Sequence, residues 1–326
     1  MNRYSKSQSN PTNPIKFGTR DFEYLLRSLY QQIERGDVVS IDLSPYDELD
    51  LGALANLLVL AIALRSGSLG TVHPPIDILL PNNPKAARML FKCGFFRFAC
   101  QPDLRDLFLN VNELQREEGT PTSDNVLLID EHGFPSMPFN LIVRPWGEER
   151  FRFAFDTQKF CWNLQETFRS ALQNVLGIPA EEARAFWIPS IELIENIYKH
   201  SKASGFGAIR CTKENVVICY ADTGIGIMQS LDKIGREIAT RKGKDWSEQA
   251  AITLAFEDGL TSLPGESGGK GLPLTKFYTL RNSGTLQLRS GSTKVLFSSK
   301  APQFAAVNYL PGTQIRIEIP KRRTKS

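Results

Sequence analysis

The chain of 326 residues is 41% hydrophobic, 10% aromatic and 23% charged. These proportions are those of a folded globular protein, so they exclude a disordered or fibrous chain, and the length predicts two domains. The formal net charge is only +4, with most basic residues placed among acidic ones, and this gives no reason to expect a nucleic-acid partner.

We expect neither a targeting segment nor a membrane span. The longest apolar run, 51–64, is shorter than the roughly 20 residues that a spanning helix needs. Residues 1–14 are polar and lack the apolar stretch of a secretory signal, so we interpret them as a disordered tail. The five cysteines show no metal-ligand spacing, which favours the reducing cytoplasm and no structural zinc. The basic segment 321–326 is interpreted as a second solvated tail, with contact to nucleic acid or acidic lipid as the alternative.

The first third of the chain alternates helical and extended patterns. Phe22, Leu25, Leu29 and Ile33 recur at helical spacing, which predicts an amphipathic helix that stops before Gly36. The elements expected in order are a helix at 21–34, a strand at 38–43, a helix at 51–65, a strand at 76–80 and a helix at 83–93. This alternation predicts a small α/β domain over residues 15–112.

The layout of this region resembles the STAS-like domains of anti-sigma-factor antagonists and sulfate transporters. In the signalling members, the loop before the helix carries Asp-Ser-Ser/Thr-Gly with a serine that a partner kinase phosphorylates. The corresponding residues here are Asp50, Leu51 and Gly52. Because no hydroxyl follows Asp50, we do not expect phosphorylation at that site. The alternative interpretation is an unrelated small α/β interaction domain.

A change of composition marks the end of this region. Residues 113–140 are rich in Glu, Gly, Pro, Ser and Asn around one short apolar run, which is typical of a linker. We therefore expect the second domain to begin at residue 141 and to end near residue 320.

The segment from Trp187 predicts a helix with a polar face. Glu192, Asn196 and His200 follow one another at intervals of four residues, so they lie on one side of the helix. If that side faces a cleft, the Asn196 amide oxygen can hold a hydrated Mg²⁺ and the Glu192 carboxylate can orient a water. The alternative is a solvated helix face.

A strand at 216–220 predicts where a second polar group lies. The strand leads into Asp222, which is followed by Gly224, Ile225 and Gly226. A carboxylate at a strand end can accept from an exocyclic amine, and glycines allow the backbone to approach a flat ring. A simple turn is the alternative.

A glycine-rich segment predicts an anion site. It runs from Ser267 through Gly268, Gly269, Lys270, Gly271 and Leu272 into a helix with Pro273 in its first turn. Glycines that open a helix expose N–H groups at its positive end, and a lysine adds charge. The spacing is not that of a Walker A loop.

These three segments, in this order, resemble the N, G1 and G2 boxes of the GHKL ATPases (gyrase, Hsp90, histidine kinase, MutL). Residues 192–196 match the N box, 222–226 the G1 box and 269–272 the G2 box, and Gly312 with Thr313 matches the family's final Gly-Thr strand. The resemblance implies an α/β fold in which a two-layer sandwich of the Bergerat type, built on a mixed sheet, follows the smaller STAS-like domain.

The resemblance also implies roles for individual residues and two cofactors, ATP and Mg²⁺. Glu192 would be catalytic and Asn196 would hold the metal, beneath a lid over residues 229–268. The residues expected to contact the nucleotide are Asn196, His200, Asp222, Gly224, Ile225, Gly226, Gly268, Gly269, Lys270, Gly271, Leu272 and Thr313. Pro273 departs from the usual Gly-Leu-Gly pattern and removes one N–H. Basic residues at 236–244 could offer a cation to the γ-phosphate, although such runs are commonly solvated.

The kind of GHKL protein follows from what surrounds the motifs. No histidine lies on a dimerising hairpin before the second region, and Glu192 stands where histidine kinases generally carry asparagine. We therefore expect an ATPase that acts as a nucleotide-driven switch, with the N-terminal domain sensing or recruiting a protein partner and a homodimer as one arrangement. The alternatives are an anti-sigma-type serine/threonine kinase in a partner-switching pathway and a non-hydrolysing ATP-binding adaptor.

Overall fold

The computed structural model describes residues 14–35, 37–69, 76–93, 95, 128–129, 135–142, 169–201, 203, 205–212, 214–257 and 269–321. The chain is of the mixed α/β class, as expected. Several segments lie outside the described residues: 1–13 of the predicted tail 1–14, most of the predicted linker, the final part of the predicted lid with Gly268, and residues 322–326.

The N-terminal region contains the predicted alternation. The predicted elements are confirmed as α1 (Thr19–Arg35), β2 (Val39–Asp42), α2 (Leu51–Arg65), β4 (Ile76–Leu79) and α3 (Pro84–Lys92). Two short strands that the sequence pattern did not predict, β1 (Lys16–Phe17) and β3 (Glu48–Leu49), pair in parallel, as do β2 and β4. In the part of this region that the structure describes, the strands thus form two small parallel sheets.

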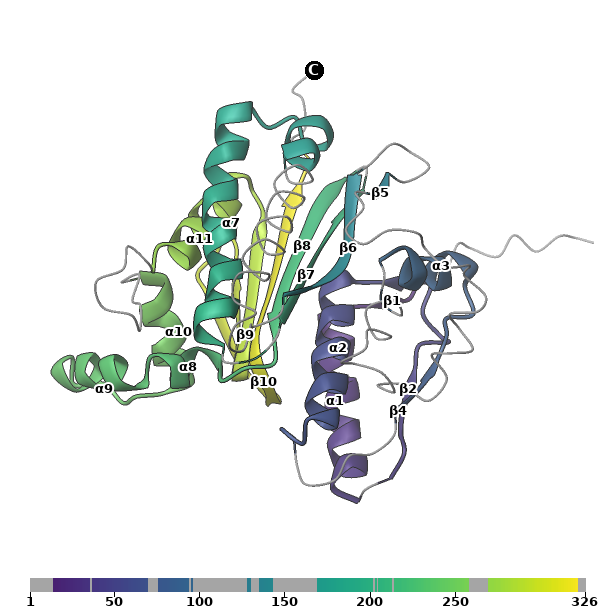
Figure 1. The fold of residues 1–326 in the computed structure, drawn as a ribbon, viewed down its shortest axis with the longest axis horizontal. Helices are drawn as coiled ribbons and strands as arrows, with labels where there is room; N and C mark the ends of the chain where they lie inside the picture. The colour runs from purple at the N-terminus through teal and green to yellow at the C-terminus, as the bar shows by residue number, and fades with distance from the viewer. Residues whose placement is uncertain are drawn as a thin grey trace, which may run out of the picture.

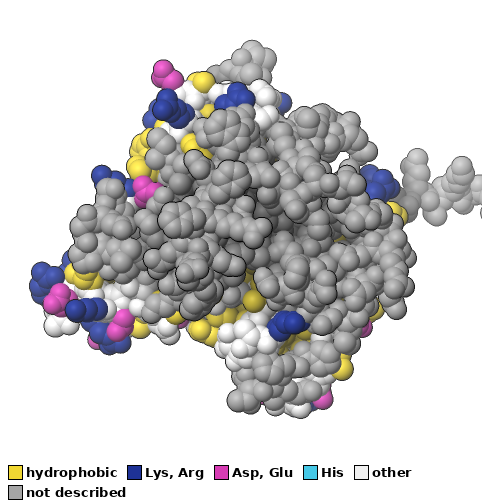
Figure 2. Space-filling model, in the orientation of Figure 1, with side chains coloured by type: hydrophobic (Ala, Val, Ile, Leu, Met, Phe, Trp, Pro, Cys, Tyr) yellow, Lys and Arg dark blue, Asp and Glu magenta, His cyan; other side chains and the backbone are white. Residues whose placement is uncertain are grey.

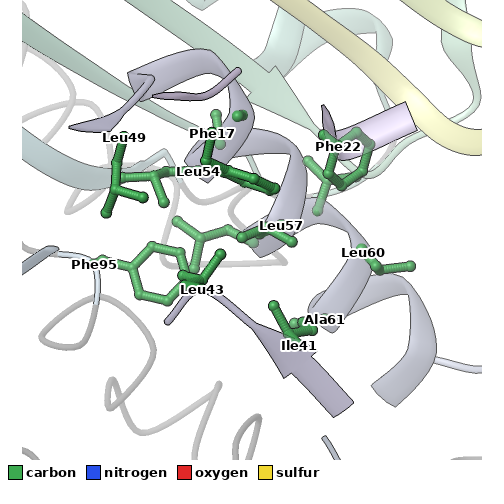
Figure 3. Packing of buried hydrophobic residues seen from close by; sticks show 14 of the residues in the cluster. Phe17, Phe22, Ile41, Leu43, Leu49, Leu54, Leu57, Leu60, Ala61 and Phe95 are labelled. Carbon is green, nitrogen blue, oxygen red and sulfur yellow. The ribbon is translucent and has the colours of Figure 1, made fainter. Parts of the chain in front are cut away.

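The core of this region lies between α1, α2 and the small sheets. Phe22 of α1 and Leu54 and Leu57 of α2 are fully buried in one cluster with Ile41 of β2 (Figure 3). The spacing of the buried residues of α1 is helical, because only one face of this helix meets the core.

A six-stranded sheet forms the second region. Its strands lie in the order β5-β6-β7-β8-β10-β9, and every pairing is antiparallel. The strands are β5 (Leu128–Ile129), β6 (Pro135–Ile142), β7 (Gly205–Cys211), β8 (Asn215–Asp222), β9 (Thr285–Phe297) and β10 (Gln303–Pro320). Among the described residues the mixed sheet expected from the resemblance is not found, since connections as short as 212–214 and 298–302 join antiparallel neighbours. β5 and most of β6 fall within the predicted linker, so the sheet begins before residue 141.

One face of this sheet is covered by helices of the second region (Figure 1). The long helix α7 (Ala180–His200) packs beside α11 (Gly271–Arg281), and α10 (Glu248–Glu257) buries Ile252 and Phe256 in the same core. The other elements are the π-helix η3 (Ala171–Val175) and the helices α8 (Gly226–Ser230) and α9 (Asp232–Arg241).

The opposite face of the sheet is covered by α2 of the N-terminal region. Leu54 and Leu57 belong to one continuous core with Phe206 of β7 and with Val217 and Ala221 of β8. Helix α2 is apolar on all sides because the small sheets bury one side and the six-stranded sheet buries the other. Across the molecule, the helices of the second region are followed by the six-stranded sheet, then by α1 and α2, and then by the small sheets (Figure 1). Among the described helices, none is both long and apolar enough to cross a membrane.

Candidate functional site

Helix α7 carries the first group of predicted site residues. Leu193, Ile194 and Ile197 are buried against the sheet, which turns the neighbouring side of the helix toward α11 and the end of β8. Glu192 and Asn196 are half-buried on α7. His200 is the last residue of the helix, and its side chain lies outside the described set.

Asp222 ends β8 on the face of the sheet that the helices cover. Its carboxylate accepts a hydrogen bond of 2.8 Å from the Gly224 N–H and a second one from the backbone N–H of Thr313 in β10. The crossing segment at Gly312 is very close, since a Cβ built there would lie 1.9 Å from the Asp222 carbonyl oxygen. Gly312 also has φ of +78°, a conformation that glycine adopts without strain.

The turn after Asp222 packs against the end of α7. A Cβ at Gly224 would lie 1.9 Å from the carbonyl oxygen of Ser201, and that oxygen accepts a 3.0 Å hydrogen bond from the Ile225 N–H. Gly226 has φ of +72° and begins α8, and the Ile227 N–H donates to Ser290 Oγ of β9. Gly224 therefore sets how closely the turn approaches α7.

The glycine-rich segment opens α11 as the sequence predicted. Gly269 has φ of +91°, Lys270 is the exposed residue before the helix, and Pro273 lies in the first turn. Gly271 touches α7, because a Cβ there would lie 2.7 Å from Glu192 Cβ. Glu192 therefore marks the contact between α7 and the start of α11.

These segments enclose a cavity of about 810 Å³, part of which is open to solvent. It brings together predicted site residues that are far apart in sequence: Asn196, Asp222, Gly226, Gly269, Leu272 and Thr313. Glu192, Gly224, Ile225, Lys270 and Gly271 adjoin this region without lining the cavity. The remaining walls consist of Leu193, Ile197, Ser201, Tyr220, Ile227, Ser230, Leu231, Ala255 and Ile315.

The charge state of Asp222 is unusual. Burial raises the pKa of its carboxyl from 3.8 to about 7, although the N–H groups of Gly224 and Thr313 act in the opposite direction. No Lys or Arg lines the cavity within the described residues. A buried carboxyl that borders a cavity, with two backbone donors and no neighbouring cation on the cavity wall, is suited to a ligand that brings its own donor.

Ser201, which the resemblance places at the border of the nucleotide beside His200, lines the cavity. Two further residues of the site are not indicated by the sequence motifs. Ser290 of β9 accepts a hydrogen bond from the Ile227 N–H at the start of α8. Gln314 follows Thr313 directly, and its Nε2 donates to the carbonyl oxygens of Asp222 and Pro311. Gln314 is in phase with the polar residues Arg316 and Glu318 of an alternating strand, so only its place next to Thr313 could have indicated a role at the site.

The predicted lid is only partly a separate feature. Ala251, Ile252 and Ala255 of α10 belong to the core, so this helix is fixed against the sheet. Helix α9 projects from the body, with basic and acidic side chains mixed on its surface (Figures 1 and 2). Arg236 pairs with Asp232 at 2.8 Å within α9. The basic residues of α9 that the structure describes do not line the cavity.

Comparison with known proteins adds no further assignment. A scan against protein-family models found no match to this chain, and a search of curated proteins found none either. Within the described ranges, no group of three or more His, Cys, Asp or Glu side chains is placed to hold a metal ion. The case for a function therefore rests on the geometry of the cavity.

Proposed function

We propose that this protein binds ATP with Mg²⁺ and hydrolyses it, so that nucleotide controls the arrangement of its helices. The single observation that carries the proposal is the cavity itself, which joins a buried carboxyl at the end of β8, an amide on α7 and a glycine with positive φ before α11. An adenine nucleotide has matching parts: an amine-bearing flat ring at one end and phosphates at the other.

Asp222 would recognise the adenine. Its carboxylate has acceptor capacity beyond the N–H groups of Gly224 and Thr313, and an exocyclic amine can use it. The apolar walls formed by Ile197, Leu231 and other residues suit a flat ring. Guanine carries an oxygen in place of this amine, so an ionised Asp222 would repel it.

The phosphates would lie toward Asn196 and the start of α11. The first N–H groups of this helix have no partners within the helix, and they carry partial positive charge. Pro273 contributes no N–H there. The amide oxygen of Asn196 would hold Mg²⁺, which when bound offsets the charge of the phosphates.

Glu192 is the residue proposed to activate water. Because it lies against Gly271 and outside the cavity wall, it would need a small shift of the start of α11 to reach the phosphates. The same observation favours, as a second candidate, a protein that binds ATP without hydrolysing it. A serine-kinase activity acting in cis on the loop at Asp50 is disfavoured, because Asp50 is buried on the face of the sheet opposite the cavity.

The test is to measure ATP binding and phosphate release by the full chain with Mg²⁺, beside Glu192→Ala and Asp222→Asn. We expect Glu192→Ala to bind ATP but release no phosphate, and Asp222→Asn to lose binding. Glu237→Ala is the matched control, because this glutamate is exposed on α9. Binding without release by the wild type would favour the adaptor, and absence of binding would end the proposal.

A further inference from the structure

A second, smaller cavity lies between α2 and the six-stranded sheet. The space between its walls is about 250 Å³, part of which is open to solvent, and this is less than a third of the space in the candidate nucleotide cavity. Its walls include Asn56 of α2, Gln287 and Arg289 of β9, and Gln314 of β10. These are polar side chains inside an apolar layer, and Asn56, Arg289 and Gln314 are each at most 5% exposed. Such groups are costly to bury unless they form hydrogen bonds.

The amide of Gln314 has only one orientation that satisfies its neighbours. Its nitrogen Nε2 lies 2.8 Å from the Pro311 carbonyl oxygen and 3.3 Å from the Asp222 carbonyl oxygen. Both neighbours are acceptors, so the nitrogen must face them and the oxygen Oε1 must point away. Gln314 thus fastens the end of β8 to the segment that crosses it at Gly312.

The other end of this amide lies on the same face of the sheet as an unmatched donor. Gln314 and Arg289 stand directly opposite each other in the β10–β9 pairing, so their side chains share one face of the sheet. Neither Gln314 Oε1 nor Arg289 Nη1 has a hydrogen-bond partner among the described residues. The rest of the Arg289 guanidinium is held by Glu23 of α1 and by the Asn308 carbonyl oxygen.

The chemistry of these two atoms selects what can bind between them. Arg289 Nη1 donates, whereas Gln314 Oε1 accepts and would repel an anion. A water molecule can accept from the first and donate to the second, and a polar cavity of this kind is where buried waters are found. A hydrated link of this type would run from α1, through Arg289 and Gln314, to the backbone of Asp222.

We propose that Gln314 is a positioning residue for the adenine-binding carboxylate, held in place from the N-terminal side by a buried water that it shares with Arg289. This inference rests on the proposed function. Gln314 touches no nucleotide itself; it fixes the backbone of Asp222 and the crossing segment whose Thr313 N–H contacts the same carboxylate. Loss of its N–H donors would loosen this corner and admit solvent to Asp222.

The test compares Gln314→Met and Gln314→Glu with Gln287→Met in the full chain. Methionine keeps the length of the side chain without its polar atoms, whereas glutamate keeps an acceptor but loses the donors. Gln287→Met is the matched control, because Gln287 lines the same cavity but accepts from Thr19 on the far side from Asp222. Adenosine affinity, the titration midpoint of the Asp222 carboxyl by NMR, and unfolding by denaturant are measured for each.

We expect both Gln314 variants to bind adenosine about fivefold or more weakly, and Gln287→Met to stay within about twofold of wild type. The Asp222 midpoint should shift in the Gln314 variants alone: it should fall toward the ordinary value in Gln314→Met, where solvent is admitted, and rise in Gln314→Glu, where a second carboxylate opposes ionisation. In a crystal structure of the wild type, a water should lie about 3 Å from both Arg289 Nη1 and Gln314 Oε1.

The proposal is overturned if Gln314→Glu behaves as wild type, if Gln287→Met has an equal effect, or if the space between the two atoms holds no water. The titration also separates this inference from the proposed function. If the wild type binds no adenosine, the nucleotide assignment fails, while the Asp222 midpoint still decides whether Gln314 positions this residue.

Discussion

Two aspartates on opposite sides of the six-stranded sheet are almost equally buried, at 6% exposure for Asp50 and 5% for Asp222, yet their surroundings differ. Asp50 caps the start of α2 and accepts hydrogen bonds from the N–H groups of Gly52 and Ala53. Its carboxylate also forms an ion pair with Arg316 of β10, in which Nη2 and Nε of the guanidinium lie 2.7 and 3.0 Å from Oδ2. Asp222 accepts from two backbone N–H groups and borders a cavity.

The difference separates a structural carboxylate from one that is available to a ligand. Burial lowers the pKa of the Arg316 guanidinium, but the charge and hydrogen bonds of Asp50 outweigh this and leave the pKa raised. The charge of Asp50 is thus matched inside the fold. Asp222 forms no ion pair with any residue that the structure describes, and burial raises the pKa of its carboxyl. Burial alone therefore does not identify a functional acid; the partners of the acid do.

The largest expected effect comes from Asp50→Asn, which keeps a good helix-capping residue but removes the charge opposite Arg316. Because Arg316 would retain only Glu318, we expect the free energy of unfolding to fall by about 3 kcal/mol. Denaturant unfolding measures this change, with exposed Asp42→Asn as the control. An unchanged midpoint of unfolding would mean that Asp50 is not the structural partner of Arg316.

Asp222→Asn should weaken nucleotide binding without lowering the stability of the fold. We expect adenine nucleotide affinity to fall about 100-fold, because the new amide opposes the amine of the ligand and the charge is lost. Stability at pH 8 should not fall, since the variant no longer buries an ionised carboxylate. Calorimetry measures the affinity and denaturant unfolding measures the stability. A loss of stability similar to that of Asp50→Asn would show that Asp222 is a structural carboxylate as well.

The raised pKa of Asp222 also predicts a pH dependence of a given sign. The folded protein holds this proton up to about pH 7, whereas the unfolded chain releases it near the ordinary value of 3.8. The stability contributed by this group is therefore complete below about pH 4 and is lost as the pH rises to 7. The effect should be on the order of 3 kcal/mol, measured as the difference between wild type and Asp222→Asn.

Ligand binding should change with pH in the other direction. If the ionised carboxylate receives the amine, adenosine affinity should rise about tenfold from pH 6 to pH 8. Adenosine is the suitable probe because it has no phosphate that titrates in this range. An affinity that does not depend on pH in the wild type would show that Asp222 binds in one charge state throughout.

The smallest effect is expected from the projecting helix α9. Arg236 is exposed and pairs with Asp232 of its own helix, so Arg236→Ala should change ATP affinity by less than about twofold. Affinity measured at low and high salt checks this. A larger loss would indicate that α9 moves toward the phosphates and that its basic residues, rather than the cavity wall alone, contact them.

The sequence predicted the N-terminal helices well, because periodicity reports burial on one side. It did not predict the position of α2. The segment 51–65 is apolar throughout, which is the pattern of a helix buried between two layers, but periodicity alone does not reveal which layer lies on the second side. Strand β5 and most of β6 lie in the segment 113–140 that we predict as a linker, because this segment is rich in Pro, Ser and Asn.

For the site, motifs indicated the residues that adjoin the cavity, but not which of them line it. Asp222, Asn196 and Leu272 reach the cavity, whereas Glu192 meets Gly271 instead, a detail that depends on how closely two helices approach. Arg289 could not be predicted, since a lone arginine in a strand usually faces solvent, whereas here it is 1% exposed. Its burial depends on Glu23, which lies 266 residues earlier in the chain.

The place of α2 has a consequence for the way this protein folds. Asp50 and Arg316 are also 266 residues apart, so the layer between them closes only after nearly the whole chain has been synthesised. Until then α2 would expose apolar surface on one side, a state that favours aggregation or capture by chaperones. Contacts of such sequence separation also slow folding. A chain shortened before β10 should therefore accumulate in insoluble form, although every element of its first region is present.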